Sequence, residues 1–267
     1  MKMETLIRST ASDFPDEVVE ELLLRSRDTL DKALRRIRRP EAAVGVVKSK
    51  LGNLLVAMSA RGIALNHYLE DTNDVAAALA RLRLEFDPVE DRGGVREVGE
   101  EVSRYLSGDG TVLRRNVDLT LAGSAFQKTI LDRLQRVPRG AVISYQALGA
   151  AAGSANSARA VGNALHNNPV PVYVPCHRVV LSDGRIGGYG GGARRKLQLL
   201  RSEGFVLDNA ATRIPDNVVW GHRETKIYCR PSCRTGAGLA RAQILFFADF
   251  KQAQRAGMRP CKICHPG

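Results

Sequence analysis

The sequence lacks any stretch of about 18 consecutive apolar residues, the length that a membrane-spanning helix requires. It also lacks an export signal, because the chain turns acidic at Asp13 and Asp16, where a signal peptide would need its apolar core. We therefore expect no membrane span and no export, and we expect the protein to be cytoplasmic.

Cysteine is scarce, with five residues in 267, and without an export signal these are not expected to form a disulfide framework. Four of them, Cys229, Cys233, Cys261 and Cys264, follow the pattern C-x3-C…C-x2-C, whereas Cys176 stands alone beside His177. This division indicates a metal site and a separate reactive thiol.

Acidic residues are few in the C-terminal half. Residues 122–204 carry eleven basic and three acidic side chains, a net charge of +8, and residues 205–267 carry ten and four, a net charge of +6. Residues 1–41 are neutral, with nine of each sign, and residues 42–121 carry ten and twelve, a net charge of −2. A solvated basic face would explain the excess, but its confinement favours a polyanionic partner, most often a nucleic acid.

The N-terminal third contains no cluster of candidate ligands. Residues 14–39 have helical periodicity between a cap at Asp13 and a stop at Pro40, and we interpret them as a docking helix without chemistry. Residues 42–70 predict three short strands separated by turns, followed by amphipathic helices over 74–86 and 95–106.

The middle of the chain predicts a mainly helical region. A helix over 124–136, capped by Ser124, precedes a short strand over 142–144. Two short helices follow, over 145–152 and from about 157 to 167, with a glycine turn between them. Their spacing is compatible with a helix-turn-helix.

The segment around Cys176 carries the candidate chemistry. Three prolines before it favour an extended approach, and five glycines surround Tyr189 in a loop that a planar group could approach closely. A thiol attacks as the thiolate, His177 could take its proton, and Glu203 is the nearest acidic residue that could orient the imidazole. For an isolated Cys-His pair, an inert buried thiol beside a surface histidine is the favoured interpretation; the proline and glycine framing weakens it but does not identify an electrophile.

Residues 122–204 resemble the catalytic domain of the O6-alkylguanine-DNA alkyltransferases, the methylated-DNA–protein-cysteine methyltransferase family. Six blocks carry the resemblance, in order and without large gaps: AFQKTILDRLQRVPRG, ISYQALG, ARAVGNAL, NPVPVYVPCHRVV, GGYGGG and KLQLLRSEG. Residues 42–121 resemble more weakly the N-terminal α/β subdomain of the family. The resemblance implies direct, irreversible transfer of an alkyl group from O6-alkylguanine, and by extension O4-alkylthymine, in double-stranded DNA to a cysteine.

The resemblance also implies the roles of individual residues. Cys176 would accept the alkyl group, with His177 as the water-mediated base and Glu203 orienting it. Asn168 would brace the turn, and Tyr145 would donate a proton to the departing guanine. Backbone carbonyls of Cys176 and Val179 would read the guanine amine, and Tyr189 and Pro171 would line the alkyl pocket.

Base flipping is the physical reason for the helix-turn-helix, because O6 of a paired guanine lies inside the duplex. Arg159 would fill the vacated stack, and the small residues Ala158, Ala160 and Gly162 would let the helix approach the minor groove. Gly190 departs from the family, in which many members have serine at that position. A thioether has no easy leaving group, so each molecule should act once.

Residues 220–264 resemble the zinc-binding methyl-acceptor domain of the bacterial Ada protein, through YCRPSC and RPCKIC. The resemblance implies a Zn²⁺ site of four cysteines, with no organic cofactor, and makes Cys229 a second acceptor for methyl groups from phosphotriesters. The alternative is a zinc-stapled module that only docks on DNA.

We therefore predict an α/β + α protein of four parts. They are a helical extension over 1–41, a ribonuclease H-like α/β subdomain over 42–121, an alkyltransferase and DNA-binding domain with a helix-turn-helix over 122–207, and a zinc-bound α+β module over 208–267. A monomer is expected. The competing hypotheses are a lesion sensor that transfers little or nothing, and a zinc-dependent thiol hydrolase.

Overall fold

The computed structural model describes residues 15, 17–21, 23–25, 39–91, 93–108, 110–111, 113–215, 219–229 and 244–266. The chain divides into two units, residues 1–40 and residues 41–267, which we describe separately. In the first unit, residues 17–21 and 23–25 are helical, and Val19 and Leu23 are buried against each other. Asp13 and most of the helix expected over 14–39 lie outside the described residues.

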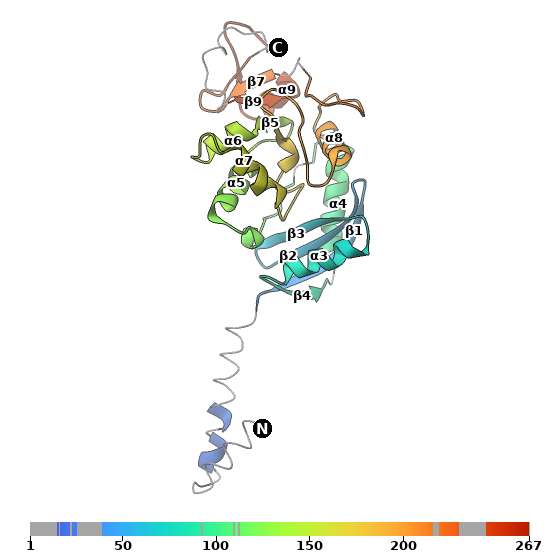
Figure 1. The fold of residues 1–267 in the computed structure, drawn as a ribbon, viewed down its shortest axis with the longest axis vertical. Helices are drawn as coiled ribbons and strands as arrows, with labels where there is room; N and C mark the ends of the chain where they lie inside the picture. The colour runs from blue at the N-terminus through green and yellow to red at the C-terminus, as the bar shows by residue number, and fades with distance from the viewer. Residues whose placement is uncertain are drawn as a thin grey trace. The chain divides into compact units, whose positions relative to one another are not determined.

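The second unit begins with a four-stranded sheet (Figure 1). Its strands are β1 (Glu41–Ser49), β2 (Gly52–Ser59), β3 (Gly62–Leu69) and β4 (Asp87–Glu90). The order is β3-β2-β1-β4, with antiparallel pairing except between β1 and β4, which are parallel. The three strands predicted over 42–70 are confirmed, whereas β4 was not predicted, because Asp-Pro at its start is typical of a turn.

Two helices cover opposite faces of this sheet, α3 (Thr72–Leu82) and α4 (Gly94–Ser107). The period of two along β2 explains the arrangement, since Leu55 and Ala57 join the core under α3 whereas Leu54 and Val56 join the core under α4. A capping box at Asp71 starts α3, and Gly108 in the left-handed conformation ends α4.

The central part is mainly helical, as the sequence predicts. It comprises α5 (Ala125–Gln135), β5 (Ala141–Ser144), α6 (Tyr145–Ala151), α7 (Ala158–His166), the 3-10 turn η2 (Cys176–Arg178), β6 (Val179–Val180) and α8 (Ala193–Ser202). Ser124 caps α5 by accepting a hydrogen bond from Gln127 N–H, as predicted. Gly153, in the left-handed conformation, lies in the turn between α6 and α7.

The C-terminal part completes a second sheet. It comprises β7 (Val219–His222), β8 (Ile227–Cys229), β9 (Ile244–Phe247), α9 (Phe250–Arg255) and β10 (Arg259–Pro260). The six-stranded order is β10-β8-β7-β9-β5-β6, so the tail strands join the strands of the central part in one sheet. This pairing between the tail and the central part was not predicted from the sequence.

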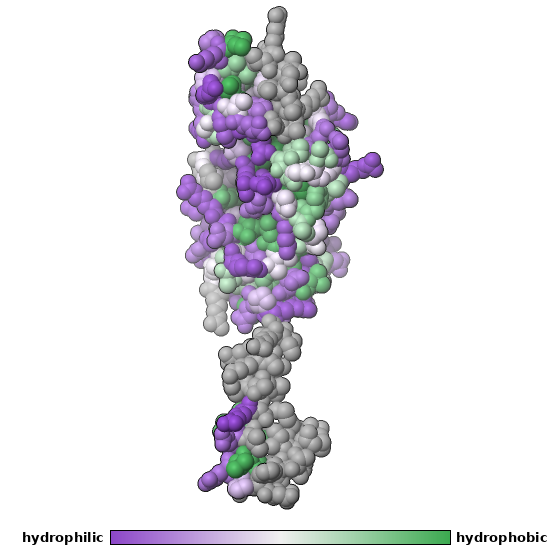
Figure 2. Space-filling model, turned by 90° about the vertical axis from the view of Figure 1, so that its left-hand side faces the viewer, coloured by the Kyte–Doolittle hydropathy of each residue, from purple (hydrophilic) through white to green (hydrophobic). Residues whose placement is uncertain are grey.

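The main hydrophobic core runs from α4 through the central helices to the tail strands. On the face shown in Figure 2, hydrophilic side chains surround smaller hydrophobic areas. Among the described residues, no helix combines the length and the apolar character that crossing a membrane would need.

Candidate functional site

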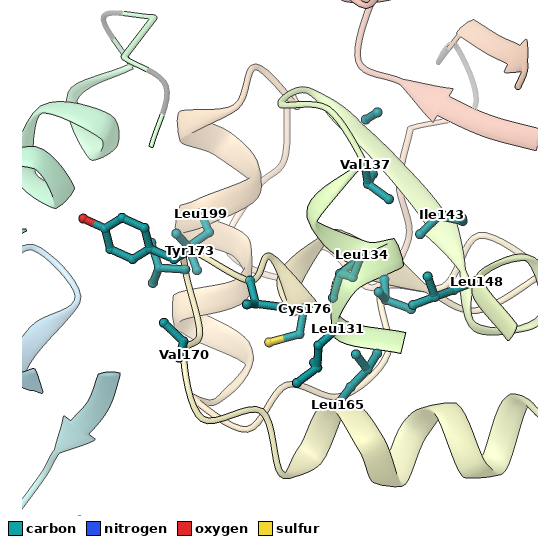
Figure 3. Packing of buried hydrophobic residues seen from close by; sticks show 14 of the residues in the cluster. Leu131, Leu134, Val137, Ile143, Leu148, Leu165, Val170, Tyr173, Cys176 and Leu199 are labelled. Carbon is teal, nitrogen blue, oxygen red and sulfur yellow. The ribbon is translucent and has the colours of Figure 1, made fainter. Parts of the chain in front are cut away.

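Cys176 lies at the start of η2, where the main core places its sulfur among apolar side chains. Figure 3 shows the thiol between Leu131, Leu165 and Val170. The side chain is 7% exposed, yet it lines two cavities. A sulfur in this position is sheltered from bulk water but remains open to a ligand that enters either cavity.

Asn168 braces the turn that carries the thiol. Its Nδ2 donates to the carbonyl oxygen of Val174 at 2.9 Å and lies 3.2 Å from Cys176 Sγ. Its Oδ1 accepts from the N–H of Val170 at 3.0 Å. One buried amide therefore connects both arms of the loop and directs a donor at the sulfur.

His177 and Glu203 form a buried imidazole–carboxylate pair. Nε2 of His177 lies 2.6 Å from Oε1 of Glu203, and neither side chain is exposed to solvent. Burial alone would raise the pKa of Glu203, but Arg178 and His177 outweigh it and hold that pKa at about 2. The carboxylate is thus ionised and accepts a hydrogen bond from Nε2–H, which leaves Nδ1 as the basic nitrogen of a neutral imidazole.

Burial, opposed by Glu203, lowers the pKa of His177 and keeps the ring neutral. Nδ1 is buried and makes no hydrogen bond with the part of the chain that the structure describes. Burial also raises the pKa of the Cys176 thiol, although Asn168 and Lys196 act in the opposite direction. The resting thiol is therefore protonated, and a neutral imidazole in the next residue is a suitable base.

The other groups that donate hydrogen bonds to Glu203 were not predicted from the sequence. Arg178 Nε donates to both carboxylate oxygens at 3.0 Å, and the backbone N–H of Gly140 donates to Oε2 at 3.1 Å. Tyr105 of α4 donates its hydroxyl to Oε1. Arg178 belongs to the PCHRV block and Tyr105 to the apolar face of α4, so pattern alone does not separate either from its neighbours.

Lys196 is a further residue that the sequence analysis missed. Its buried ammonium donates to the carbonyls of Val179, Ile186 and Gly188 at 2.7, 2.6 and 3.0 Å. Burial lowers its pKa to about 8. These bonds fix the glycine-rich loop to β6, and they leave the Val179 carbonyl its second lone pair for the predicted contact with a base.

Two cavities meet at Cys176. One, of about 390 Å³, is lined by Tyr145, Gly162, Leu165, Tyr189 and neighbouring residues. The predicted residues Tyr145 and Tyr189 therefore share a cavity with the thiol. A cavity of this size is within the range that binds small planar ligands.

The second cavity, of about 310 Å³, has one wall from the N-terminal sheet. Pro171 and Tyr189 line it, and so do Asn66 and Tyr68, from a segment without a cluster of candidate ligands in its sequence. The hydroxyls of Tyr68 and Tyr189 lie 2.8 Å apart, and the Arg195 guanidinium lies 4.5 Å from the centroid of the Tyr68 ring. Residues 42–121 are therefore part of the site.

Helix α7 presents the predicted small and basic residues on its outer face. Ala158, Arg159 and Ala160 are exposed and Gly162 is half-buried, whereas Val161, Ala164 and Leu165 face the core. This exposed face is free of large side chains apart from Arg159 over the first turn. Such a surface can approach a flat or grooved polymer closely.

Three tail cysteines converge into one cluster. The sulfur atoms of Cys229, Cys261 and Cys264 all lie within 4.8 Å of one another, and Cys233 lies outside the described residues. Sulfur atoms around a tetrahedral zinc ion with bonds of about 2.3 Å would be about 3.8 Å apart. The described ligands thus fit a metal ion of that size, and thiolates favour soft or borderline cations.

Two family models match this chain, and the boundary between them separates Cys176 from the tail cysteines. The family model "6-O-methylguanine DNA methyltransferase, DNA binding domain" matches residues 125–205. The model "Metal binding domain of Ada" matches residues 206–267.

Several curated proteins are similar to this chain. The methylated-DNA–protein-cysteine methyltransferase of Methanosarcina barkeri is 31% identical over 160 residues, covering 59% of this chain and 94% of that protein. The bifunctional transcriptional activator/DNA repair enzyme Ada of Escherichia coli is 35% identical over 158 residues, covering 58% and 43%. The chain spans 64% of the Salmonella typhimurium methyltransferase that it matches with 37% identity over 110 residues.

Solved structures show the same relationship. The Mycobacterium tuberculosis O6-methylguanine methyltransferase aligns with a TM-score of 0.51 and 30% identity, covering 61% of this chain and 92% of that one. The Mycobacterium tuberculosis OGT in complex with DNA aligns with a TM-score of 0.50 and 31% identity, covering 59% and 90%. Both share a mixed α/β fold with this chain.

Proposed function

The chain belongs to the methylated-DNA–protein-cysteine methyltransferase family, and on that premise we propose that it repairs DNA by moving an alkyl group from O6 of guanine to Cys176. The observation that carries this proposal is the buried contact of 2.6 Å between His177 and Glu203 beside a thiol that lines two cavities. Double-stranded DNA with an alkylated guanine would be the partner, and O4-alkylthymine a further substrate. One chain carries Cys176, His177 and Glu203 together, so a monomer suffices.

The reaction would be a single nucleophilic displacement at the alkyl carbon. His177 Nδ1 takes the thiol proton, through water, and the Cys176 sulfur attacks the alkyl carbon as its bond to O6 breaks. Guanine leaves as an anion and takes a proton from Tyr145, and the proton held by His177 returns through water to the Tyr145 oxygen. Overall, the thiol hydrogen replaces the alkyl group on the base. The product is a thioether, which has no facile leaving group, so each molecule reacts once.

The base must leave the duplex to reach the sulfur. We propose that α6 and α7 act as a helix-turn-helix, with Arg159 filling the vacated stack and Ala158, Ala160 and Gly162 allowing close approach to the minor groove. The carbonyls of Cys176 and Val179 would read the guanine amine, while Pro171 and Tyr189 would hold the alkyl group. Asn168 would keep the turn in place.

We also propose the domain boundaries of the sequence analysis. The sheet order β3-β2-β1-β4 with its single parallel pair supports a ribonuclease H-like subdomain over 42–121. The alkyltransferase domain would occupy 122–207 and the metal module 208–267, preceded by the extension over 1–41.

The tail cluster would hold Zn²⁺ through Cys229, Cys261, Cys264 and Cys233. The ion would keep these thiols deprotonated and crosslink a module with a small core of its own. Cys229 is 2% exposed, which favours structural support and DNA docking over methyl acceptance from a phosphotriester. We therefore expect methylphosphotriester DNA to leave Cys229 unmodified, as peptide mass spectrometry would show.

A direct experiment tests the main proposal. Incubation with a duplex containing O6-methylguanine should add one methyl group to the peptide that carries Cys176 and restore guanine in the DNA. A Cys176→Ala variant should bind the duplex and leave the lesion intact. If wild-type protein binds tightly but gains no methyl group, the chain is a lesion sensor. Peptide hydrolysis with repeated turnover would instead identify a thiol hydrolase.

A further inference from the structure

One β-sheet carries both cysteine centres at its two ends. At one end of the order β10-β8-β7-β9-β5-β6, strand β6 follows directly after η2, which contains Cys176. At the other end, β8 finishes at Cys229 and β10 immediately precedes Cys261. The alkyl-acceptor region and the metal module are therefore parts of one continuous hydrogen-bonded structure.

The joint between them is the pairing of β9 with β5. The strands are antiparallel, with Ala141 opposite Phe247 and Val142 opposite Phe246. Phe247 is fully buried in the same core as Ile143 and Cys176. Burial of this apolar ring holds the tail strand against the core, and the strand covers an otherwise open edge of β5.

A short series of hydrogen bonds leads from this strand pairing to the His177–Glu203 pair. The N–H of Ala248 donates to the carbonyl of Gly140 at 3.0 Å. The N–H of Gly140 donates to Glu203 Oε2 at 3.1 Å, and Glu203 Oε1 meets His177 at 2.6 Å. A single residue, Gly140, thus lies between the tail strand and the carboxylate that orients the base.

Gln252 of α9 packs on the same residue. A Cβ at Gly140, whose φ is +75°, would lie 2.6 Å from Gln252 Cδ, so the glutamine side chain lies directly over this glycine. Gln252 Nε2 lies 3.5 Å from the carbonyl oxygen of Glu203. The module therefore contacts the backbone of both Gly140 and Glu203, the two residues that precede His177 in this series of hydrogen bonds.

We propose that the C-terminal metal module is a positioning element for the alkyl-acceptor centre. Through β9 and Gln252 it holds Gly140 and Glu203 in place, so that metal occupancy of the tail cluster governs the reactivity of Cys176. The inference rests on the proposed function, in which Cys176 accepts the alkyl group. Its physical basis is that the buried cluster around the tail cysteines, Trp220, Cys229 and Cys261, is small and is expected to need a metal to hold it together. Loss of that support would loosen β9 at the β5 edge.

The first experiment uses the full chain and a matched pair of substitutions on α9. Gln252→Ala removes the contact with Gly140, whereas Gln254→Ala removes a hydrogen bond to Tyr228 inside the module. The measurements are the rate of methyl transfer from a single-stranded O6-methylguanine oligonucleotide and the pH dependence of Cys176 alkylation by iodoacetamide. Lys196, Tyr68, Tyr145 and Tyr189, the other ionisable groups that influence the thiol, remain in place in both variants.

We expect Gln252→Ala to slow both reactions about threefold to tenfold and to move the alkylation profile to higher pH, because the imidazole is less well oriented. Gln254→Ala should leave both unchanged. Equal effects of the two substitutions, or no effect of either, would contradict a positioning role.

The second experiment removes the metal from the wild-type chain with a chelator and restores it with Zn²⁺. We expect the same shift of the iodoacetamide profile, together with faster hydrogen exchange at the amides of β5, and reversal of both by zinc. An unchanged profile with weaker duplex binding would show that the module only docks on DNA, and would overturn the inference. If zinc alters the profile but O6-methylguanine DNA never methylates Cys176, the coupling stands and the proposed function fails.

Discussion

Cys176 and the tail cysteines are two thiol centres on one sheet, and they are prepared for chemistry by different means. Cys176 is a single thiol whose pKa is raised by burial, and in the proposed function the oriented pair His177 and Glu203 deprotonates it. The tail thiols lie within 4.8 Å of one another, where several thiolates are stable together only around a cation. The first centre should therefore respond to hydrogen-bond geometry, and the second to metal.

The largest effect is expected from Glu203→Gln. Loss of the carboxylate removes the group that fixes the imidazole, so alkyl transfer to Cys176 should fall about 10²–10³-fold, the range of general-base contributions. The metal content of the tail should not change. Single-turnover transfer and metal analysis on the same sample would measure both.

The control for that substitution is Glu100→Gln, which removes an exposed pair with Arg96 on α4. It should change transfer less than twofold, since such pairs contribute about 0.3–0.5 kcal/mol. A similar fall in both variants would mean that the carboxylate acts only through stability.

The Glu203 carboxylate should also make the free energy of unfolding depend on pH in the acid range. The folded pKa of Glu203 is about 2, below its ordinary value of 4.5, so its ionised form stabilises the fold above pH 4.5. That stabilisation is lost as pH falls from 4.5 toward 2, when the unfolded chain takes up the proton first. In urea titrations, the difference in free energy of unfolding between wild type and Glu203→Gln should shrink through this window.

A smaller effect, confined to duplex DNA, is expected from Arg159→Ala. Without the side chain that we propose fills the vacated stack, the flipped state should lose about 1–2 kcal/mol, and transfer from a duplex should slow about tenfold. Transfer from a single-stranded oligonucleotide should be nearly unchanged, because no partner base is left behind. Equal losses on both substrates would assign Arg159 to phosphate binding.

Tyr105→Phe should have a more modest effect on the Cys176 centre. It removes one of the hydrogen bonds to Glu203 and leaves those of Arg178 and Gly140. A net contribution of about 1 kcal/mol predicts a transfer rate about fivefold lower. A loss as large as that of Glu203→Gln would show that the hydroxyl itself moves a proton.

The smallest effect is expected from Gly190→Ser, which introduces the serine that the family resemblance leads us to expect at this position. A Cβ at this position would lie 3.8 Å from the nearest atom, the carbonyl oxygen of His166, so the side chain fits without strain. Its hydroxyl could contact O6, and transfer should rise by less than about threefold. Slower transfer would indicate that the glycine keeps the entrance open for larger alkyl groups.

The sequence predicted the local structure well where one signal dominates. Short runs separated by turn residues over 42–70 predicted the three strands, and Ser124 predicted the start of α5. Cys176, His177 and Glu203 were singled out from the sequence, and the structure brings His177 and Glu203 together beside the thiol.

Long-range pairing was beyond prediction. The short apolar run at Ile244–Phe247 carries no mark of its partner strand β5, a hundred residues away, because periodicity reports which face is buried and not what covers it. Charged residues are assigned to the surface by default, so Arg178 and Lys196 were missed as buried anchors. Each is buried because several carbonyl or carboxylate oxygens converge on it.

The contrast between the two thiol centres has one direct test. A duplex that carries both an O6-methylguanine and a methylphosphotriester is incubated with the metal-loaded chain, and every cysteine peptide is analysed by mass spectrometry. The account predicts one methyl group on Cys176 and none on Cys229, with guanine restored. A methyl group on Cys229 alone, with Cys176 unmodified and the base lesion intact, would contradict it.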